Sequence, residues 1–540
     1  MPPHRLAYRP TVMGTRGVVT SAHFLASMAG IEMLLAGGNA VDAAVAVGST
    51  LNVVEPFMSG VGGIGLMLMS RARGGERHVL DFIGRSPIAS DAARCTEDEL
   101  AGGPKACATP GNLGGWLTAH ARFGRMDRAA VLAPAIGHAE RGVPLSGKNV
   151  DFFEAARATL ARSPEAGRLY LGNGGPRAGG IVTYKELAAT LRQVAEGGAE
   201  AFYKGPIARA IARAVGESGG WLDEADLAAF APEWREPATI RYRDRDVYSV
   251  PPPFSAFQML ETLNILETYD LRAFGHNSAD YLHHLIEAIK LGSADRLAYA
   301  YTADVPIQGL LSKPYASSQR ARIDARRAAV SEGERHNPDK LAGQIEEGYP
   351  ARFENEHTTH FACADAEGTV VSVTQTLGVP FGSGFAVPGT GIVLNNILKW
   401  MDRDPASPNV LRPGRQAGTM MSPTQVFRRG AFALSIGTPG SYGILQTTPQ
   451  MLLNVLEFDM TIQEAIEAPR VRVYRDRLVD GEARIGADVR AELERRGHEV
   501  HVLDEWSWVV GGGQGIVRDP ESGALTAGAD PRRDGYALAI

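Results

Sequence analysis

The sequence predicts a layered fold of helices and β-strands, and three segments carry that prediction. Residues 39–47 form a helical pattern that is apolar almost all round, as expected for a helix buried against a sheet. Residues 361–377 place two runs of strand-forming residues around a short turn, which is typical of an antiparallel hairpin. From Pro110 to Phe230 the pattern is mainly helical, which indicates a helical layer or subdomain. The length of 540 residues allows two to four domains or one large unit.

Hydrophobic periodicity and turn residues place the remaining elements along the chain. The other predicted helices are 26–36, which Gly37 and Gly38 close, 184–196, 206–217, 223–230, 257–267, 278–300 and one around 461–467. The other predicted strands are 66–69, 77–82, 239–250, 425–428, 431–436, 511–517 and 536–539, with a β-α-β unit between 471 and 502. Gly60-Val-Gly-Gly-Ile-Gly65 superficially resembles a dinucleotide-binding loop, but a strand follows these glycines where such a loop needs a helix. A tight structural turn is therefore expected there.

Composition excludes several classes of function. The net charge of -6 argues against nonspecific nucleic-acid binding, and no apolar run is long enough for a membrane span. The three cysteines form neither a CxxC pair nor a zinc-type cluster, so we expect no disulfide framework, no metal and no cofactor. Because the first ten residues also lack the apolar core of a signal peptide, we predict a cytoplasmic protein with neither nucleic-acid nor membrane partners.

A threonine at the start of the hairpin is the main candidate for chemistry. If the turn is centred near Glu367, Thr358 lies opposite Thr376 on the second strand. A threonine hydroxyl needs a base beside it, and its own α-amino group, with a reference pKa near 7.7, serves if the chain is cut just before it. The plain alternative is that Thr358 opens a strand because threonine favours strands.

Three other features have both a functional and a structural interpretation. Arg85 follows a strand in a loop, where a guanidinium binds a carboxylate or simply faces solvent. The glycines of residues 437–443 either present backbone N–H groups to an oxyanion or form a tight turn. His283 and His284 lack a second ligand pair and are interpreted as structural or surface residues. Residues 317–351 are polar and charged, as a solvated or mobile segment upstream of Thr358 would be.

Together these segments resemble the gamma-glutamyltranspeptidase family of N-terminal nucleophile hydrolases. The matching motifs are Gly37-Gly-Asn-Ala-Val-Asp-Ala-Ala44, Pro252-Pro-Phe-Ser, Thr358-Thr-His-Phe361, Gly391-Ile-Val-Leu-Asn-Asn396, Met421-Ser-Pro-Thr424, Gly437-Thr-Pro-Gly440 and Asp530-Pro-Arg-Arg-Asp534. The resemblance implies an α+β fold, a four-layer αββα sandwich. It also implies a precursor that cuts itself between His357 and Thr358 into a large chain, 1–357, and a small chain, 358–540, which remain paired.

The same resemblance assigns the catalytic roles. Thr358 corresponds to the nucleophile and Thr376 to the threonine that positions it by hydrogen bonding. Gly440 matches one of two oxyanion-hole glycines, and Ser441 replaces the other, where its backbone N–H can still donate. An acyl-enzyme would form on Thr358 and be released by water or an amine.

The substrate-binding positions depart from the glutathione-cleaving pattern. The places that hold the acyl donor's charged head group in those members are occupied here by Gly378, Ile397, Trp400, Thr419 and Met420. The carboxylate-binding arginine falls two positions later, as Arg85, which resembles the divergent cytoplasmic branch that includes oxamate amidohydrolase-like members. We therefore predict an amidohydrolase for a small carboxylate-bearing amide, gamma-glutamyl or shorter, with hydrolysis favoured over transfer because no amine-acceptor site is recognisable.

Two alternatives stay open. One is an acylase, or a carbon–carbon bond hydrolase of secondary metabolism, whose more apolar acyl pocket is lined by Ile397, Trp400 and Met420. The other is a binding scaffold without turnover. Retention of Thr358, Thr376 and Gly440 argues against the scaffold.

Overall fold

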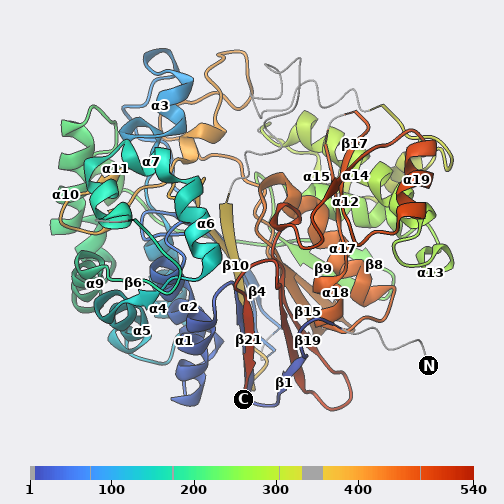
Figure 1. The fold of residues 1–540 in the computed structure, drawn as a ribbon, viewed down its shortest axis with the longest axis horizontal. Coiled ribbons are helices and arrows are strands. Elements are labelled where there is room, and N and C mark those ends of the chain that lie inside the picture. The colour runs from blue at the N-terminus through green and yellow to red at the C-terminus, as the bar shows by residue number, and fades with distance from the viewer. Residues whose placement is uncertain (1–6, 73–74, 173–174, 303, 331–356, 475) are drawn as a thin grey trace.

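The computed structural model describes residues 7–72, 75–172, 175–302, 304–330, 357–474 and 476–540. Two seven-stranded sheets pack face to face in the middle of the molecule, and helices cover the outer face of each (Figure 1). The predicted α+β class and four-layer αββα sandwich are therefore confirmed.

The first sheet contains the predicted hairpin at its centre. Its order is β21 (Tyr536–Ala539), β2 (Gly17–Ser21), β10 (His357–Asp365), β11 (Val370–Gly378), β3 (Ile64–Ser70), β4 (Arg77–Phe82) and β7 (Glu233–Arg235). Each neighbouring pair in this order is antiparallel. Strand β11 is buried along its whole length, as expected for a strand covered on both faces.

The second sheet faces the first. Its order is β1 (Val12–Gly14), β20 (Leu525–Ala529), β19 (Gln514–Arg518), β15 (Ala431–Gly437), β14 (Thr424–Arg428), β9 (Arg245–Ser249) and β8 (Ala238–Tyr242). Smaller sheets are formed by β5 (Val143–Pro144) with β6 (Ile181–Val182), by β12 (Ala386–Val387) with β13 (Ile392–Val393), and by β16 (Val471–Val473), β17 (Leu478–Glu482) and β18 (Glu499–Leu503). Strands β17 and β18 are parallel and joined through α19 (Ala487–Arg495), so the predicted β-α-β unit is confirmed.

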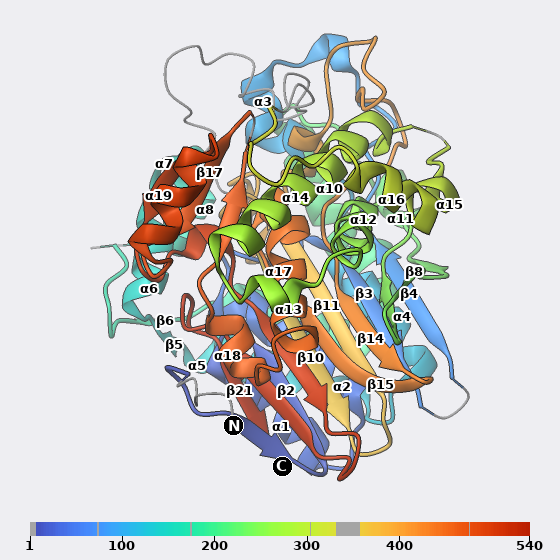
Figure 2. The same ribbon diagram turned by 90° about the vertical axis from the view of Figure 1, so that its right-hand side faces the viewer.

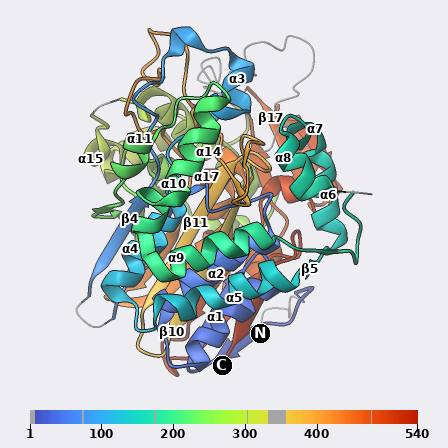
Figure 3. The ribbon, with the colours of Figure 1, turned by 90° about the vertical axis from the view of Figure 1, so that its left-hand side faces the viewer.

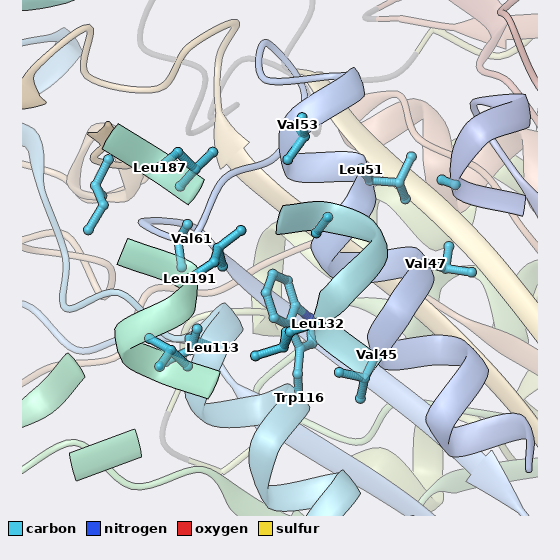
Figure 4. Close-up of a cluster of buried hydrophobic side chains, with 14 of the residues drawn as sticks. Val45, Val47, Leu51, Val53, Val61, Leu113, Trp116, Leu132, Leu187 and Leu191 are labelled. Carbon is cyan, nitrogen blue, oxygen red and sulfur yellow. The ribbon is translucent and has the colours of Figure 1, made fainter. Parts of the chain in front are cut away.

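One helical layer covers the first sheet (Figure 3). Helices α1 and α2 lie on the sheet, α4 and α5 pack against α2, and α9 packs against α5. Every residue of α2 is buried, and the Asn39 side chain caps its start by accepting hydrogen bonds from Val41 and Asp42 backbone N–H groups. Trp116 of α4 and Leu132 of α5 pack near Val45 and Val47 of α2 (Figure 4). The helices on this side are α1 (Phe24–Leu35), α2 (Ala40–Val54), α3 (Glu97–Ala101), α4 (Asn112–Phe123), α5 (Arg128–Arg141), α6 (Gly147–Ala155), α7 (Arg157–Ala161), α8 (Pro164–Ala166), α9 (Lys185–Tyr203), α10 (Pro206–Glu217) and α11 (Glu224–Ala228).

The second helical layer covers the other sheet (Figure 2). Its helices are α12 (Ala256–Leu266), α13 (Leu271–Phe274), α14 (Ala279–Tyr299), α15 (Ile307–Leu310), α16 (Lys313–Arg320), α17 (Ile444–Leu456) and α18 (Ile462–Glu467), together with α19. The predicted helices at 257–267, 278–300 and 461–467 agree with these bounds to within two residues. No helix of the described residues combines the length and apolarity needed to cross a membrane.

One predicted strand is wrong. Residues 239–250 were expected to form a single strand, but the structure folds them into the hairpin of β8 and β9, in which Tyr242 pairs with Arg245. Arg243 adopts a left-handed backbone conformation, with φ 49°, and the chain reverses over two residues. Asp244 then forms an ion pair with Arg428, which lies on the neighbouring strand β14. The alternating pattern continues through the turn, so periodicity alone did not reveal it.

Candidate active site at the head of strand β10

The hairpin register brings the two predicted catalytic threonines together. Strand β10 pairs with β11 so that Thr358 lies opposite Thr376, and the register shifts between His357 and Thr358. Both threonines are buried. Because directly opposed residues of an antiparallel pair point to the same side of the sheet, the two side chains share one face.

Alternation along β10 decides which face that is. The Thr359 side chain points toward the first helical layer, where its Oγ1 donates a hydrogen bond of 3.1 Å to Glu55 Oε2. His360 points the opposite way, because its ring packs directly against Gly437 of β15 in the second sheet. Thr358 therefore shares the side of His360 and points between the two sheets.

Thr376 is held from several directions. Its Oγ1 accepts a hydrogen bond of 2.9 Å from the Gly378 backbone N–H. The turn at Gly62 and Gly63 approaches so closely that a Cβ on Gly63 would lie 2.4 Å from the Thr376 carbonyl oxygen. A strand, β3, follows these glycines, as predicted. The glycine-rich turn therefore serves close backbone packing beside the second catalytic candidate.

The loop of the predicted oxyanion hole leads into helix α17. Gly440 has φ 132° and Ser441 has φ 55°, so two consecutive residues have left-handed backbone conformations. Turn conformations are one way in which backbone N–H groups are gathered into an anion site. Gly437, three residues earlier, packs on the His360 ring, and the Gly512 N–H donates to Thr438 Oγ1 at 2.9 Å. These contacts anchor the loop near the head of β10.

Two buried ionisable side chains contact Thr358 and Thr359. Neither was predicted to belong to the site. The Arg533 Nη1 atom donates to the Thr358 carbonyl oxygen at 3.2 Å, and Arg533 is buried. Glu55 is also buried, and burial raises its pKa to about 7 even though the charge of Arg533 and the Thr359 hydrogen bond lower it. Arg533 belongs to a motif that carried the resemblance, which was the available signal. Glu55 directly follows α2 and offered no comparable signal.

The predicted carboxylate ligand lies at the surface. The Arg85 side chain is about half exposed, and its Nη2 atom forms an ion pair of 2.9 Å with Glu233 Oε1. Its backbone forms a bridge with Gln416. A substrate carboxylate would have to replace Glu233 to bind this guanidinium.

The absence of a side chain at position 378 has a steric cause. Gly378 has φ 106°, and a Cβ there would lie 2.0 Å from Asn396 Oδ1 and 3.7 Å from a methyl group of Ile397. Asn396 Oδ1 accepts a hydrogen bond from the Val379 N–H at 3.1 Å. The Asn396 side chain thus fills the space that a larger residue at 378 would need.

The remaining predicted substrate positions are mostly buried. Ile397, Thr419 and Met420 are all at most 3% exposed, whereas Trp400 is partly exposed. The Trp400 Nε1 atom is buried without an acceptor among the described residues. Thr419 Oγ1 accepts a hydrogen bond from the Met421 N–H at 3.2 Å, so its hydroxyl stabilises the local backbone.

A cavity of about 560 Å³ lies beside the segments that contain Arg85, Thr419 and Ser441. Gln416, which bridges to Arg85, and Gly418, which precedes Thr419, both line it. The Tyr301 hydroxyl lies 3.3 Å from that of Tyr442, the residue after Ser441. The lining residues are Pro253, Ala300, Tyr301, Thr302, Pro408, Asn409, Arg412, Pro413, Arg415, Gln416 and Gly418.

The described lining of this cavity is positively charged. It includes Arg412 and Arg415, and no Asp or Glu is among the described lining residues. Arg415 donates to the carbonyl oxygens of Val410 and Pro408, whereas among the described residues no carboxylate lies within ion-pair distance of Arg412. Asn409 is buried, and its Oδ1 atom has no donor among the described residues. The two arginines suit this cavity to an anion.

A buried histidine cluster lies in the second helical layer. His283 Nδ1 is 2.8 Å from His498 Nε2, and with Glu287 these residues form a group of potential metal ligands. The Glu287 carboxylate already forms an ion pair of 2.8 Å with Lys290, and His283 Nε2 lies 2.7 Å from the Asp324 carbonyl oxygen. An ammonium group beside the carboxylate opposes a divalent cation, so this cluster fits the predicted structural role.

Known proteins share both the sequence and the fold. The family model described as gamma-glutamyltranspeptidase matches residues 26–540. The chain belongs to the gamma-glutamyltranspeptidase family. It is 37% identical to the acylase ACY 1 proenzyme of Pseudomonas sp. (strain V22), over 98% of this chain and 94% of that protein. It is 32% identical to the glutathione hydrolase proenzyme of Escherichia coli (strain K12), over 96% of this chain and 91% of that protein.

A solved structure agrees over the full length. The crystal structure of cephalosporin acylase from Bacillus halodurans superimposes with a TM-score of 0.90 and 31% identity, covering 100% of this chain and 98% of that one. The gamma-glutamyltranspeptidase family and its N-terminal nucleophile hydrolase fold therefore account for the whole sandwich. The protein is accordingly an amidohydrolase of this family.

Proposed function

We propose that the protein is a self-processing threonine amidohydrolase that cuts itself between His357 and Thr358 and then hydrolyses a small carboxylate-bearing amide. The observation that carries this proposal is the buried pairing of Thr358 with Thr376 at the head of β10. Self-processing is also supported by the relatives, several of which are named as proenzymes. The fragments 1–357 and 358–540 would stay paired, because β10 lies between β2 and β11, and β11 in turn pairs with β3.

In this mechanism the residues of the chain act in a fixed order. The Thr358 hydroxyl attacks the substrate carbonyl carbon, and its proton passes to the Thr358 α-amine. The backbone N–H groups of Gly440 and Ser441 stabilise the oxyanion, and the leaving amine takes the proton from the α-ammonium. Water then attacks the ester on Thr358 and releases the acid, which restores the hydroxyl.

The proposed substrate class rests on the positively charged cavity. Arg412 supplies a cation without a described carboxylate partner. The carboxylate of such an amide would bind this cation. Hydrolysis is proposed rather than transfer, because no second ordered site for an amine is recognisable among the described residues.

An acylase with a more apolar acyl donor is the second candidate. Ile397 and Met420 are buried apolar residues at positions where the glutathione-cleaving pattern has polar ones, and two similar proteins are named acylases. A cytoplasmic location stays a prediction. The three cysteines are free and buried, which suits a reducing compartment.

The first test is self-cleavage. Purified wild type and Thr358→Ala are compared by denaturing gel, intact mass and N-terminal sequencing. Two fragments with a new N-terminus at Thr358, absent from the variant, are expected. A wild-type chain that stays whole for days at neutral pH would refute the proposed mechanism.

The second test addresses the substrate. Glutamyl, oxamyl and aromatic-acyl amides are compared with wild type, Arg412→Gln and the exposed control Arg209→Gln. Arg412→Gln is expected to raise KM at least about tenfold for carboxylate-bearing amides, because a charged hydrogen bond contributes roughly 1.5–3 kcal/mol. Preference for uncharged aromatic acyl groups, with no effect of Arg412→Gln, would favour the acylase.

A further inference from the structure

Glu55 and Arg533 are buried charged groups that the mechanism above does not use. They come from opposite ends of the chain, Glu55 from the end of α2 and Arg533 from the segment that precedes β21. Both are at most 3% exposed. Placing two ionisable side chains in such a position costs free energy unless they interact with other polar groups.

Their contacts converge on the backbone that carries the nucleophile. Arg533 Nη1 donates to the carbonyl oxygen of Thr358, and Glu55 Oε2 accepts from the hydroxyl of Thr359. The two groups therefore bind consecutive residues of β10. They attract each other as well, since Arg533 lowers the pKa of Glu55 and Glu55 raises that of Arg533 against the effect of burial.

This position matters once the chain has been cut. Thr358 then begins a chain, so its peptide link to residue 357 no longer restrains it. Strand pairing with Thr376 remains on one side, and Arg533 holds the carbonyl group. The side chain and the α-amine must keep a fixed geometry for the amine to accept the proton of the hydroxyl.

The two charges are also close enough to affect the α-amine. Ordinary bond lengths put the Thr358 nitrogen within about 10 Å of both the Arg533 guanidinium and the Glu55 carboxylate. A cation nearby disfavours the ammonium form, whereas an anion favours it. At an effective dielectric constant near 20, a unit charge at this range shifts a titration by about one pH unit.

We propose that Glu55 and Arg533 are positioning residues, which fix the backbone of the new N-terminus at Thr358 and balance the basicity of its α-amine with opposite charges. This inference rests on the proposed function, because it needs Thr358 as the processed nucleophile. It assigns Glu55 a role distinct from that of Thr376, which faces the nucleophile from the neighbouring strand.

Among the described residues, two aspartates also act on the charges of Glu55 and Arg533. Asp534 raises the pKa of Glu55, and Asp530, which forms an ion pair of 2.6 Å with Arg470, also interacts with Arg533. On the Thr358 face of β10, burial lowers the pKa of His360 to about 3, so that ring is neutral at the pH of the assay. Removing Glu55 thus leaves the Arg533 cation beside Thr358 with Asp530 still interacting with it, whereas removing Arg533 leaves the carboxylates of Glu55 and Asp534.

The test is the pH profile of kcat/KM for processed protein. Glu55→Gln is expected to move the acid limb to lower pH by up to about one unit, because the cation alone then lowers the pKa of the α-amine. The shift is smaller at pH values where Glu55, whose pKa is about 7, is already partly protonated. Arg533→Gln is expected to move the acid limb to higher pH. This shift is expected to be smaller than that of Glu55→Gln, because a neighbouring carboxylate also becomes easier to protonate. Glu55→Asp keeps the charge and is expected to restore the wild-type limb.

Matched variants separate positioning from general damage. Glu287→Gln makes the same change beside Lys290, in helix α14 of the outer layer, and should leave the acid limb unchanged. Thr359→Val removes the hydroxyl but keeps both ionisable groups, so it should lower kcat and move the limb less than Glu55→Gln does, since the lost hydrogen bond only raises the pKa of Glu55. Opposite shifts for Glu55→Gln and Arg533→Gln are not expected from a loss of stability.

Three results would overturn the proposal. They are an unmoved acid limb in both Glu55→Gln and Arg533→Gln, the same direction of shift in the two, or Glu55→Asp behaving like Glu55→Gln. Folded chains that stay uncut in both Glu55→Gln and Glu55→Asp would also count against it, since the role would then depend on shape rather than charge. Failure of the wild type to cut itself would instead refute the proposed function.

Discussion

The contact between Gly437 and His360 joins the second sheet to strand β10, which carries Thr358, and it yields a quantitative prediction. A Cβ at position 437 would lie 2.2 Å from His360 Cε1, 2.5 Å from Nδ1 and 2.6 Å from Nε2. The ring cannot easily turn away, because its Nδ1 atom lies 2.8 Å from Thr374 Oγ1 and the residue is fully buried. In Gly437→Ala the strand β15 must therefore retreat from β10.

The size of the effect follows from the distances. Ordinary contacts of a Cβ begin near 3.4 Å, so relief of the clash takes a movement of about 1 Å. Overpacking of this kind costs about 1–3 kcal/mol of stability. Because the Gly440 loop continues from β15, the same movement displaces the proposed oxyanion donors from Thr358, and a misplacement of about 1 Å costs on the order of 100-fold in rate.

The assay measures both quantities. Denaturant unfolding gives the stability, and densitometry of the fragments over time gives the rate of self-cleavage. Gly481→Ala is the matched control, because a Cβ at that strand position meets its nearest atom at 3.5 Å. The double variant with His360→Ala should recover part of the loss, with a coupling energy of about 1–3 kcal/mol. Gly437→Ala that cleaves at the wild-type rate with unchanged stability would refute the reasoning.

Three further predictions concern other parts of the fold. Gly378→Ala combines left-handed strain of about 1–2 kcal/mol with a Cβ 2.0 Å from Asn396 Oδ1, so thermal denaturation should show a clear loss of stability, and an unchanged melting temperature would contradict it. Lys290→Met leaves Glu287 as a buried unpaired carboxylate, and chemical denaturation should show a loss of about 3–5 kcal/mol that Glu287→Leu in the same chain largely removes. Burial and the nearby Lys290 charge lower the pKa of His498 from 6.5 to about 3, so between those pH values only the unfolded chain binds this proton. Stability should then fall as pH decreases from about 6.5, by up to about 1.4 kcal/mol per pH unit, and His498→Gln should flatten this slope in melting curves.

Much of the site followed from local sequence rules. Asp365 and Gly368 define the hairpin turn, and pairing of Thr358 with Thr376 follows from counting outward from it. The Asn39 cap and helix α10, observed as Pro206–Glu217, were also predicted from residues near in sequence. Local rules failed at Arg243, where a turn without glycine, proline or asparagine interrupts an alternating pattern. They also left open whether Arg85 binds a substrate, and in the structure its side chain is paired with Glu233.

The sequence by itself determined the family, the layered fold and the nucleophile candidate with its partner threonine. These depend on motifs, on hydrophobic periods and on a turn whose residues are neighbours in the chain. Only the tertiary structure decided which charged groups lie beside Thr358 and where the cavity lined by Arg412 and Arg415 forms. Glu55 and Arg533 meet at β10 because two helical layers and two sheets pack together, and no local pattern encodes that meeting. The positive cavity beside Tyr301 likewise forms from segments brought together by packing, so its charge and volume exist only in the folded chain.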